Sequence, residues 1–127
     1  MNEPTLLLTP TPVFHNVQVT AFRKIVDGKP VFECFCYPAK VVIASPNAVI
    51  GYQLVAPTDS KIVMTGMTKL NPPSERQLSD ASVSVDGRLL LLSDRNTIPA
   101  DIHIRLEFLY HGEEAFTHDP QIGNVPE

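Results

Sequence analysis

Residues 101–110, DIHIRLEFLY, decide the fold because apolar and polar side chains alternate along them. Successive side chains of a β-strand point to opposite faces, so a period of two indicates a strand with one buried face. The predicted core face carries four apolar side chains: Ile102, Ile104, Leu106 and Phe108. The opposite face carries four ionisable side chains: Asp101, His103, Arg105 and Glu107.

The sequence on either side of this stretch is also typical of β-structure. Twelve prolines and six glycines separate short runs rich in Val, Ile, Phe and Leu, as in all-β domains. These runs predict strands at residues 13–22, 30–37, 40–44, 49–55, 61–67, 81–85, 88–92, 101–110 and 115–118. Residues 68–80 can hold one short helical turn after a Pro-Pro pair. We therefore expect an all-β, antiparallel, immunoglobulin-like β-sandwich, although the absence of tryptophan argues against an antibody-type domain.

Two turns and one apolar run add detail to this expectation. The pairs Asp27-Gly28 and Asp86-Gly87 lie between predicted strands and predict tight type I′ turns, in which both central residues have positive φ. Residues 89–92 are four leucines, so this run is apolar on both faces and predicts either a central strand or an oligomer contact. We expect the chain to form a homo-oligomer, a dimer or a tetramer.

Length, composition and charge limit the possible domain organisation and the possible partners. A chain of 127 residues with 43% hydrophobic residues predicts a single β-sandwich domain over residues 1–127. Within it we expect residues 1–12 to form an extended arm and residues 120–127 a C-terminal tail strand. A net charge of −4 with scattered basic residues argues against nucleic acid or a membrane as partner. The N-terminus has no basic region and only three consecutive leucines, so we expect a cytoplasmic protein.

The two cysteines, Cys34 and Cys36, are two residues apart on a predicted strand. They would share a face of that strand, an arrangement that suits a mutual disulfide poorly. No further ligands of matching spacing accompany them. We therefore expect free thiols, no metal site and no cofactor. The serines lack the sequence context of a Ser-His-Asp triad, and no glycine loop suited to binding phosphate is present.

The C-terminal sequence contains the only Asp-Pro bond of the chain, Asp119–Pro120. An X-Pro bond is a tertiary amide with a weakened trans preference and no N–H. The Asp119 side chain can reach its own carbonyl carbon and close a five-membered ring, which makes this peptide bond unusually easy to break. The alternative interpretation is that Asp-Pro simply marks a turn.

The strand register decides what surrounds this bond. A three-residue loop containing Gly112 would pair Phe116 with Phe108 and bury both rings. The same register places Asp119 across from Arg105. His103 and Glu107 would then be diagonal neighbours of Asp119, whereas a two-residue loop would turn Phe116 outward. We expect two carboxylates, a guanidinium and an imidazole to gather near the bond; the alternative is a solvated strand face with weak ion pairs of ~0–1 kcal/mol each.

A predicted all-β chain of this length, with one Asp-Pro bond before a short tail, resembles the DP-EP family of small bacterial self-cleaving proteins. The resemblance rests on residues 118–120, the tail 121–127 and the strand 101–110. It implies a self-assembling β-sandwich that cuts its own Asp119–Pro120 bond, as an intramolecular aspartic-type endopeptidase. It also implies that the C-terminal piece stays bound in the sheet.

The resemblance further implies a catalytic carboxylate, and two mechanisms are open. Asp119 can attack its own carbonyl carbon, or Asp101 or Glu107 can act as a general base on water. The candidate site residues are Asp119, Pro120, Asp101, Glu107, Arg105 and His103. The alternative function is a non-enzymatic β-sandwich interaction or assembly module with no catalytic activity.

Overall fold

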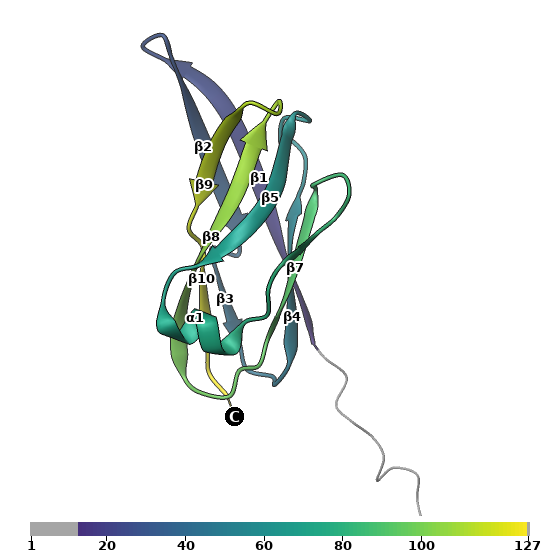
Figure 1. Cartoon of the computed structure of the whole chain (residues 1–127), viewed down its shortest axis with the longest axis vertical. Helices are drawn as coiled ribbons and strands as arrows, with labels where there is room; N and C mark the ends of the chain where they lie inside the picture. The colour runs from purple at the N-terminus through teal and green to yellow at the C-terminus, as the bar shows by residue number, and fades with distance from the viewer. Residues whose placement is uncertain (1–12, 127) are drawn as a thin grey trace, which may run out of the picture.

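The computed structural model describes residues 13–126 and is built mainly of β-strands arranged in two sheets (Figure 1). The first sheet contains, in spatial order, β2 (Lys29–Tyr37), β1 (Phe14–Val26), β4 (Ala48–Leu54), β7 (Leu89–Asp94) and β6 (Ser82–Val83). The second contains β3 (Lys40–Ile43), β10 (Gln121–Asn124), β8 (Ala100–Tyr110) and β5 (Ile62–Lys69), with β9 (Glu114–His118) also paired to β8. The all-β prediction is confirmed, while the predicted arm of residues 1–12 lies outside the described residues.

Both sheets are mixed, so the prediction of a purely antiparallel sandwich is wrong. Strand β1 runs parallel to β4, and β10 runs parallel to β3. The reason is the path of the chain, which leaves the first sheet after β2, forms β3 in the second sheet and returns as β4. Neighbours in each sheet are therefore often distant in sequence, and the alternation within one strand does not reveal their direction.

The core lies between the sheets and contains the predicted face of β8. Ile102, Ile104, Leu106 and Phe108 are all buried, in one cluster with side chains of β1, β4 and β7 from the other sheet. Leu90 and Leu92 belong to the same cluster, and β7 is an internal strand between β4 and β6. The four-leucine run is thus a central strand, one of its two predicted roles.

Of the two predicted Asp-Gly turns, one has positive φ at both central residues and the other does not. Asp27 and Gly28 have φ of 51° and 78° and connect β1 to β2 as predicted. At Asp86-Gly87 only Gly87 has positive φ, 72°, so the type I′ prediction is wrong there. The Asp86 carboxylate instead accepts hydrogen bonds from Ser84 Oγ at 2.7 Å and from the Arg88 amide at 3.0 Å, which holds Asp86 in a different turn.

The short helix α1 (Pro72–Gln77) fixes one end of β8. Its N-cap, Asn71, donates from Nδ2 to the carbonyl of Asp101 at 2.9 Å and accepts from the amide of His103 at 3.2 Å. Because the Asn71 side chain also accepts a hydrogen bond from the Ser74 amide of the helix, it anchors α1 and β8 to each other. Within the described residues, no helix is long and apolar enough to cross a membrane.

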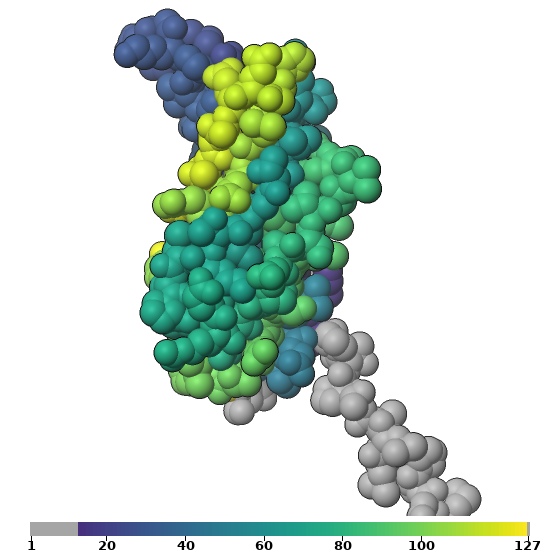
Figure 2. Space-filling model, in the orientation of Figure 1, coloured from purple at the N-terminus to yellow at the C-terminus, as the bar shows by residue number. Residues whose placement is uncertain are grey.

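The hairpin of β1 and β2 extends beyond the rest of the molecule, as Figure 2 shows for its tip. Below this tip, at Phe32, the hairpin packs on β9 through aromatic rings. Phe116 of β9 stacks on Phe108 at 4.8 Å and on Phe32 of β2 at 4.2 Å between ring centroids. This column of three rings brings β2 of the first sheet against β9 of the second.

Candidate functional site

The candidate site is the junction between β9 and β10, two strands that follow one another along the same edge of β8. Leu106 of β8 faces His118 of β9, and His103 faces Gln121 of β10. These pairs belong to one uninterrupted register, which sets Asp119 opposite Arg105. Pro120 interrupts the ladder because it has no N–H to donate. The three-residue loop at residues 111–113 and the pairing of Phe108 with Phe116 confirm the predicted register.

Arg105 holds the Asp119 carboxylate by two points. Arg105 Nε donates to Asp119 Oδ1 at 2.9 Å, and Nη2 donates to Oδ2 at 3.2 Å. This hydrogen-bonded ion pair lowers the pKa of Asp119 below its usual range and raises the pKa of Arg105. The forked geometry fixes the plane of the carboxylate as well as its charge. Both side chains are about half exposed, so we assign this pair an orienting role rather than a large contribution to stability.

The candidate scissile bond joins an exposed residue to a buried one. Asp119 is exposed, whereas Pro120 is buried. His118, on the other side of Asp119, is half-buried and shares the inward face with Pro120. Alternation of side chains about the strand accounts for this pattern. The Asp119 carboxylate therefore meets solvent while the leaving group, the Pro120 nitrogen, belongs to a packed residue.

The remaining predicted site residues are not gathered at this bond. Glu107 accepts a hydrogen bond from Thr68 Oγ1 of β5 at 2.9 Å, on the side of β8 opposite to β10. Asp101 lies opposite Gly123 and pairs with Lys40 Nζ at 3.0 Å. Of the expected cluster of two carboxylates, a guanidinium and an imidazole, direct hydrogen bonds join only Arg105 and Asp119, while Glu107 also acts on Arg105 through its charge.

His103, the last of the predicted site residues, lies opposite Gln121 and two positions from Arg105 on β8. Its backbone amide is bound to Asn71, and its side chain has no hydrogen bond within the described residues. Of the six predicted residues, the structure brings together Arg105, Asp119 and Pro120.

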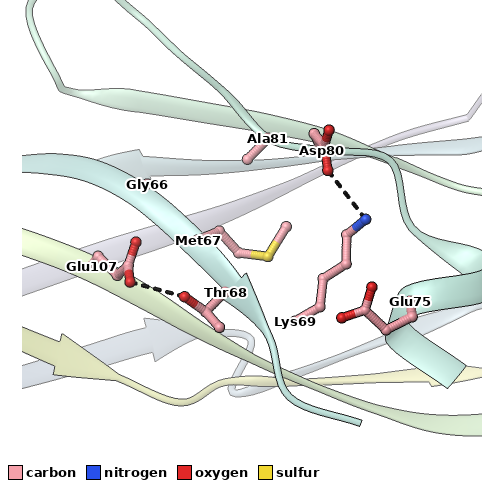
Figure 3. A pocket seen from close by; sticks show the side chains of 8 residues that line it. All are labelled: Gly66, Met67, Thr68, Lys69, Glu75, Asp80, Ala81 and Glu107. Atoms are coloured by element: carbon pink, nitrogen blue, oxygen red, sulfur yellow. Dashed lines mark hydrogen bonds and ion pairs between the residues drawn. The ribbon is translucent and has the colours of Figure 1, made fainter. Parts of the chain in front are cut away.

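Glu107 instead lines an open pocket of about 460 Å³ between β5, β8 and the segment after α1 (Figure 3). Lys69 crosses the pocket wall to reach Asp80 at 3.3 Å, and Glu75 of α1 adds a further carboxylate. The pocket is on the opposite side of β8 from Asp119. The pocket therefore lies beside the edge of β8 that pairs with β5, rather than beside the edge that pairs with β9 and β10.

The C-terminal tail is integrated into the second sheet. Strand β10 lies between β3 and β8 and pairs with both, and Ile122 is fully buried. Asn124 Nδ2 donates to Asp94 Oδ1 at 2.9 Å, and the amide of Val125 donates to the carbonyl of Ile43 at 2.9 Å. The tail thus contributes a central strand, core packing and a link to the other sheet.

The ion pair of Lys40 and Asp101 spans the tail. Asp101 on β8 lies opposite Gly123 of β10, and Lys40 on β3 lies opposite Gln121, two positions before Gly123. A Cβ at Gly123 would lie 2.9 Å from Lys40 Cε, so the absent side chain leaves room for the lysine to cross. Asp101 therefore belongs to the contacts that hold the tail.

A cluster missed by the sequence reasoning lies beside the junction. The ligand atoms of Cys34, Cys36 and His118 are all within 4.8 Å of one another. Hydrogen bonding from Cys34, then from His118, lowers the pKa of Cys36 against the opposing effect of burial. The hydrogen bond with Cys36 raises the pKa of His118. The hydrogen bond between the two cysteines, together with burial, raises the pKa of Cys34.

One signal for this cluster was present in the sequence. In the predicted register His118 shares the inward face with Phe116, and the two cysteines share one face of their strand. What the sequence could not supply is the contact between β2 and β9, which joins the two sheets.

Comparison with known proteins gives a family match and distant structural likenesses. The model of the DP-EP family matches residues 12–126. The crystal structure of the inclusion body protein PixA from Burkholderia cenocepacia aligns with a TM-score of 0.47 at 7% identity, covering 93% of this chain and 99% of that chain. No curated protein matches this sequence at a significant level.

Proposed function

The chain belongs to the DP-EP family, and from this premise we propose that it hydrolyses its own Asp119–Pro120 bond and retains the C-terminal peptide. The observation that carries the proposal is the two-point contact of Arg105 with Asp119 beside the buried Pro120. It presents an oriented, ionised carboxylate at the only Asp-Pro bond of the chain, where attack through a five-membered ring meets a tertiary amide that lacks an N–H.

In the proposed mechanism the Asp119 side chain is the attacking group. One carboxylate oxygen forms a bond to the carbonyl carbon of Asp119, and the bond from that carbon to the Pro120 nitrogen breaks. The nitrogen takes a proton and leaves as a secondary amine. Water then opens the cyclic anhydride, which regenerates the side-chain carboxylate and creates a new C-terminal carboxylate. One water molecule is consumed, and residue 120 becomes a new N-terminus.

The surroundings of Asp119 favour this route over a helper carboxylate. General-base activation of water needs a carboxylate within hydrogen-bond reach of that water. Glu107 is bound to Thr68 on the far side of β8, and Asp101 is paired with Lys40 across Gly123. Intramolecular attack needs no such partner, because the reacting groups are already held together. Arg105 can keep one carboxylate oxygen while the other turns towards the carbonyl carbon.

The contacts of the tail support retention of the product. After cleavage, residues 120–127 would still pair with β3 and β8 and keep Ile122 in the core. Removing a central strand would leave backbone groups of both neighbours without partners, which is costly when they are buried. We therefore propose that the two polypeptides produced by cleavage stay bound to each other in one folded molecule.

Mass spectrometry of the purified protein tests this proposal. Under denaturing conditions we expect two polypeptides, residues 1–119 and 120–127, that elute together from a size-exclusion column under native conditions. The Asp119→Asn variant, whose amide is a poor nucleophile, should remain intact. A wild-type chain that stays unbroken would instead favour the non-enzymatic assembly module.

A further inference from the structure

Three soft or borderline metal ligands converge where β2 meets β9. Cys34 and Cys36 lie two residues apart on β2 and so share a face. His118 ends β9, which the stacked rings of Phe32 and Phe116 hold against β2 at 4.2 Å. The three ligand atoms lie within 4.8 Å of one another, the only such group among the described residues.

This donor set and spacing suit a tetrahedral metal ion. Zinc binds cysteine sulfur at about 2.3 Å and histidine nitrogen at about 2.0–2.1 Å. Ligand atoms at the corners of such a tetrahedron lie roughly 3.6–3.8 Å apart. The ligand atoms of the three residues lie within 4.8 Å of one another, so their separations need to shorten by at most about 1 Å to match this tetrahedral spacing. Small side-chain rotations can supply that movement. Two thiolates favour zinc and other thiophilic ions over magnesium or calcium, which prefer oxygen ligands.

We propose that Cys34, Cys36 and His118 bind one thiophilic metal ion, with Zn²⁺ as the probe. Three protein ligands leave the fourth position of a tetrahedron for water or another small ligand. All three side chains are half-buried, so solvent can reach the site while the backbone of two strands holds its ligands. Both cysteines are free thiols, as the sequence predicts, and the proposal departs from the sequence-based expectation only in assigning them a metal ion. It stands whether or not the neighbouring bond is cut.

A disulfide between the two cysteines is the main competing state. Alternate residues of a strand have Cα atoms about 6.5–7 Å apart, at the upper limit of disulfide geometry. The bond would also leave His118 without a role at the cluster. Reduction before metal addition separates the two states, because only the dithiol can supply two thiolates.

The test measures zinc and cobalt binding by the full-length, reduced protein. After addition of excess Zn²⁺ and gel filtration, we expect about one zinc per chain by elemental analysis. Co²⁺ should give tetrahedral visible bands and a thiolate charge-transfer band. Cys34→Ser and Cys36→Ser should each weaken the charge-transfer band and lower affinity at least tenfold. His118→Asn should lower affinity while keeping the thiolate band.

His111→Asn is the matched control, because His111 lies in the exposed turn between β8 and β9. This variant should bind one zinc with unchanged affinity. Circular dichroism establishes that each variant is folded. The proposal is overturned if reduced wild-type protein retains no zinc and gives no thiolate–cobalt band. It is equally overturned if the folded cysteine variants bind zinc as tightly as the His111→Asn control.

Discussion

Asn124 of the C-terminal tail donates a hydrogen bond from Nδ2 to Asp94 Oδ1 at 2.9 Å, and both residues are buried. Asp94 ends β7 of the first sheet, whereas Asn124 ends β10 of the second. The contact joins the segment that follows the Asp-Pro bond to the opposite half of the core. Retention of a cleaved tail can therefore be tested separately from cleavage itself.

Ile122→Ala should loosen the tail of the cleaved protein. Truncating a fully buried Ile to Ala costs about 2–5 kcal/mol, which corresponds to roughly a 30-fold or larger loss of affinity for the peptide. The measurement is the fraction of peptide 120–127 that co-elutes with residues 1–119 on native gel filtration. Val125→Ala is the control, because this side chain is half exposed and its backbone bond to Ile43 would remain. Equal retention in both variants would contradict the assigned role of β10.

Asp94→Asn should change how stability depends on pH. Burial raises the pKa of Asp94 above its ordinary value, despite the hydrogen bonds from Asn124 and Asn96 and the charge of His15. The fold thus favours the protonated form. That stabilising contribution is fully present below the unfolded pKa of about 3.9 and is lost as pH rises through the folded value.

An Asn at position 94 keeps the Oδ1 acceptor and carries no charge. The difference in free energy of unfolding between Asp94→Asn and wild type should therefore grow as pH rises from about 4 towards neutrality. Urea denaturation at several pH values measures it. A difference that is constant with pH, or that shrinks, would rule out a raised pKa at Asp94.

Arg105→Gln should slow cleavage because it removes the two-point contact that orients the Asp119 carboxylate. Misplacing a reacting group by about 1 Å can cost around 100-fold in rate, so we expect roughly a tenfold to hundredfold decrease. Arg76→Gln, an exposed change on α1, provides the control. The measurement is the first-order rate constant of appearance of peptide 120–127. An Arg105→Gln rate equal to the control would show that the contact has no positioning role.

Asp101→Asn and Glu107→Gln should leave the cleavage rate within about twofold of wild type. Neither carboxylate is directed at the bond, since their partners are Lys40 and Thr68. Glutamine at position 107 can still accept the hydrogen bond from Thr68. Rates from the same mass-spectrometric time course decide the matter. Arrest of cleavage by either substitution would contradict attack by Asp119 alone and would indicate that the substituted carboxylate activates water.

The contact between Arg105 and Asp119 was predictable from sequence because its causes are local. Alternation along residues 101–110 sets the faces of β8. The loop between β8 and β9 needs positive φ at His111 and Gly112, observed at 53° and 72°, and this fixes the register. Once Phe116 faces Phe108, the position of Asp119 follows.

Other features depend on contacts between distant segments and could not be predicted from sequence alone. The parallel pairs of β1 with β4 and β3 with β10 result from the crossing of the chain between sheets. The engagement of Glu107 by Thr68 requires β5 beside β8. The cluster of Cys34, Cys36 and His118 requires β2 to pack on β9, which the aromatic column accomplishes.

The central claim, cleavage of Asp119–Pro120 by the chain itself, is tested most directly by following newly synthesised protein over time at several concentrations. The account predicts that intact chain converts to residues 1–119 and 120–127 with a first-order rate constant independent of protein concentration, and that Asp119→Asn made in parallel stays whole. An intact wild-type chain that persists, a rate constant that rises with concentration, or equal cleavage of Asp119→Asn would contradict the claim.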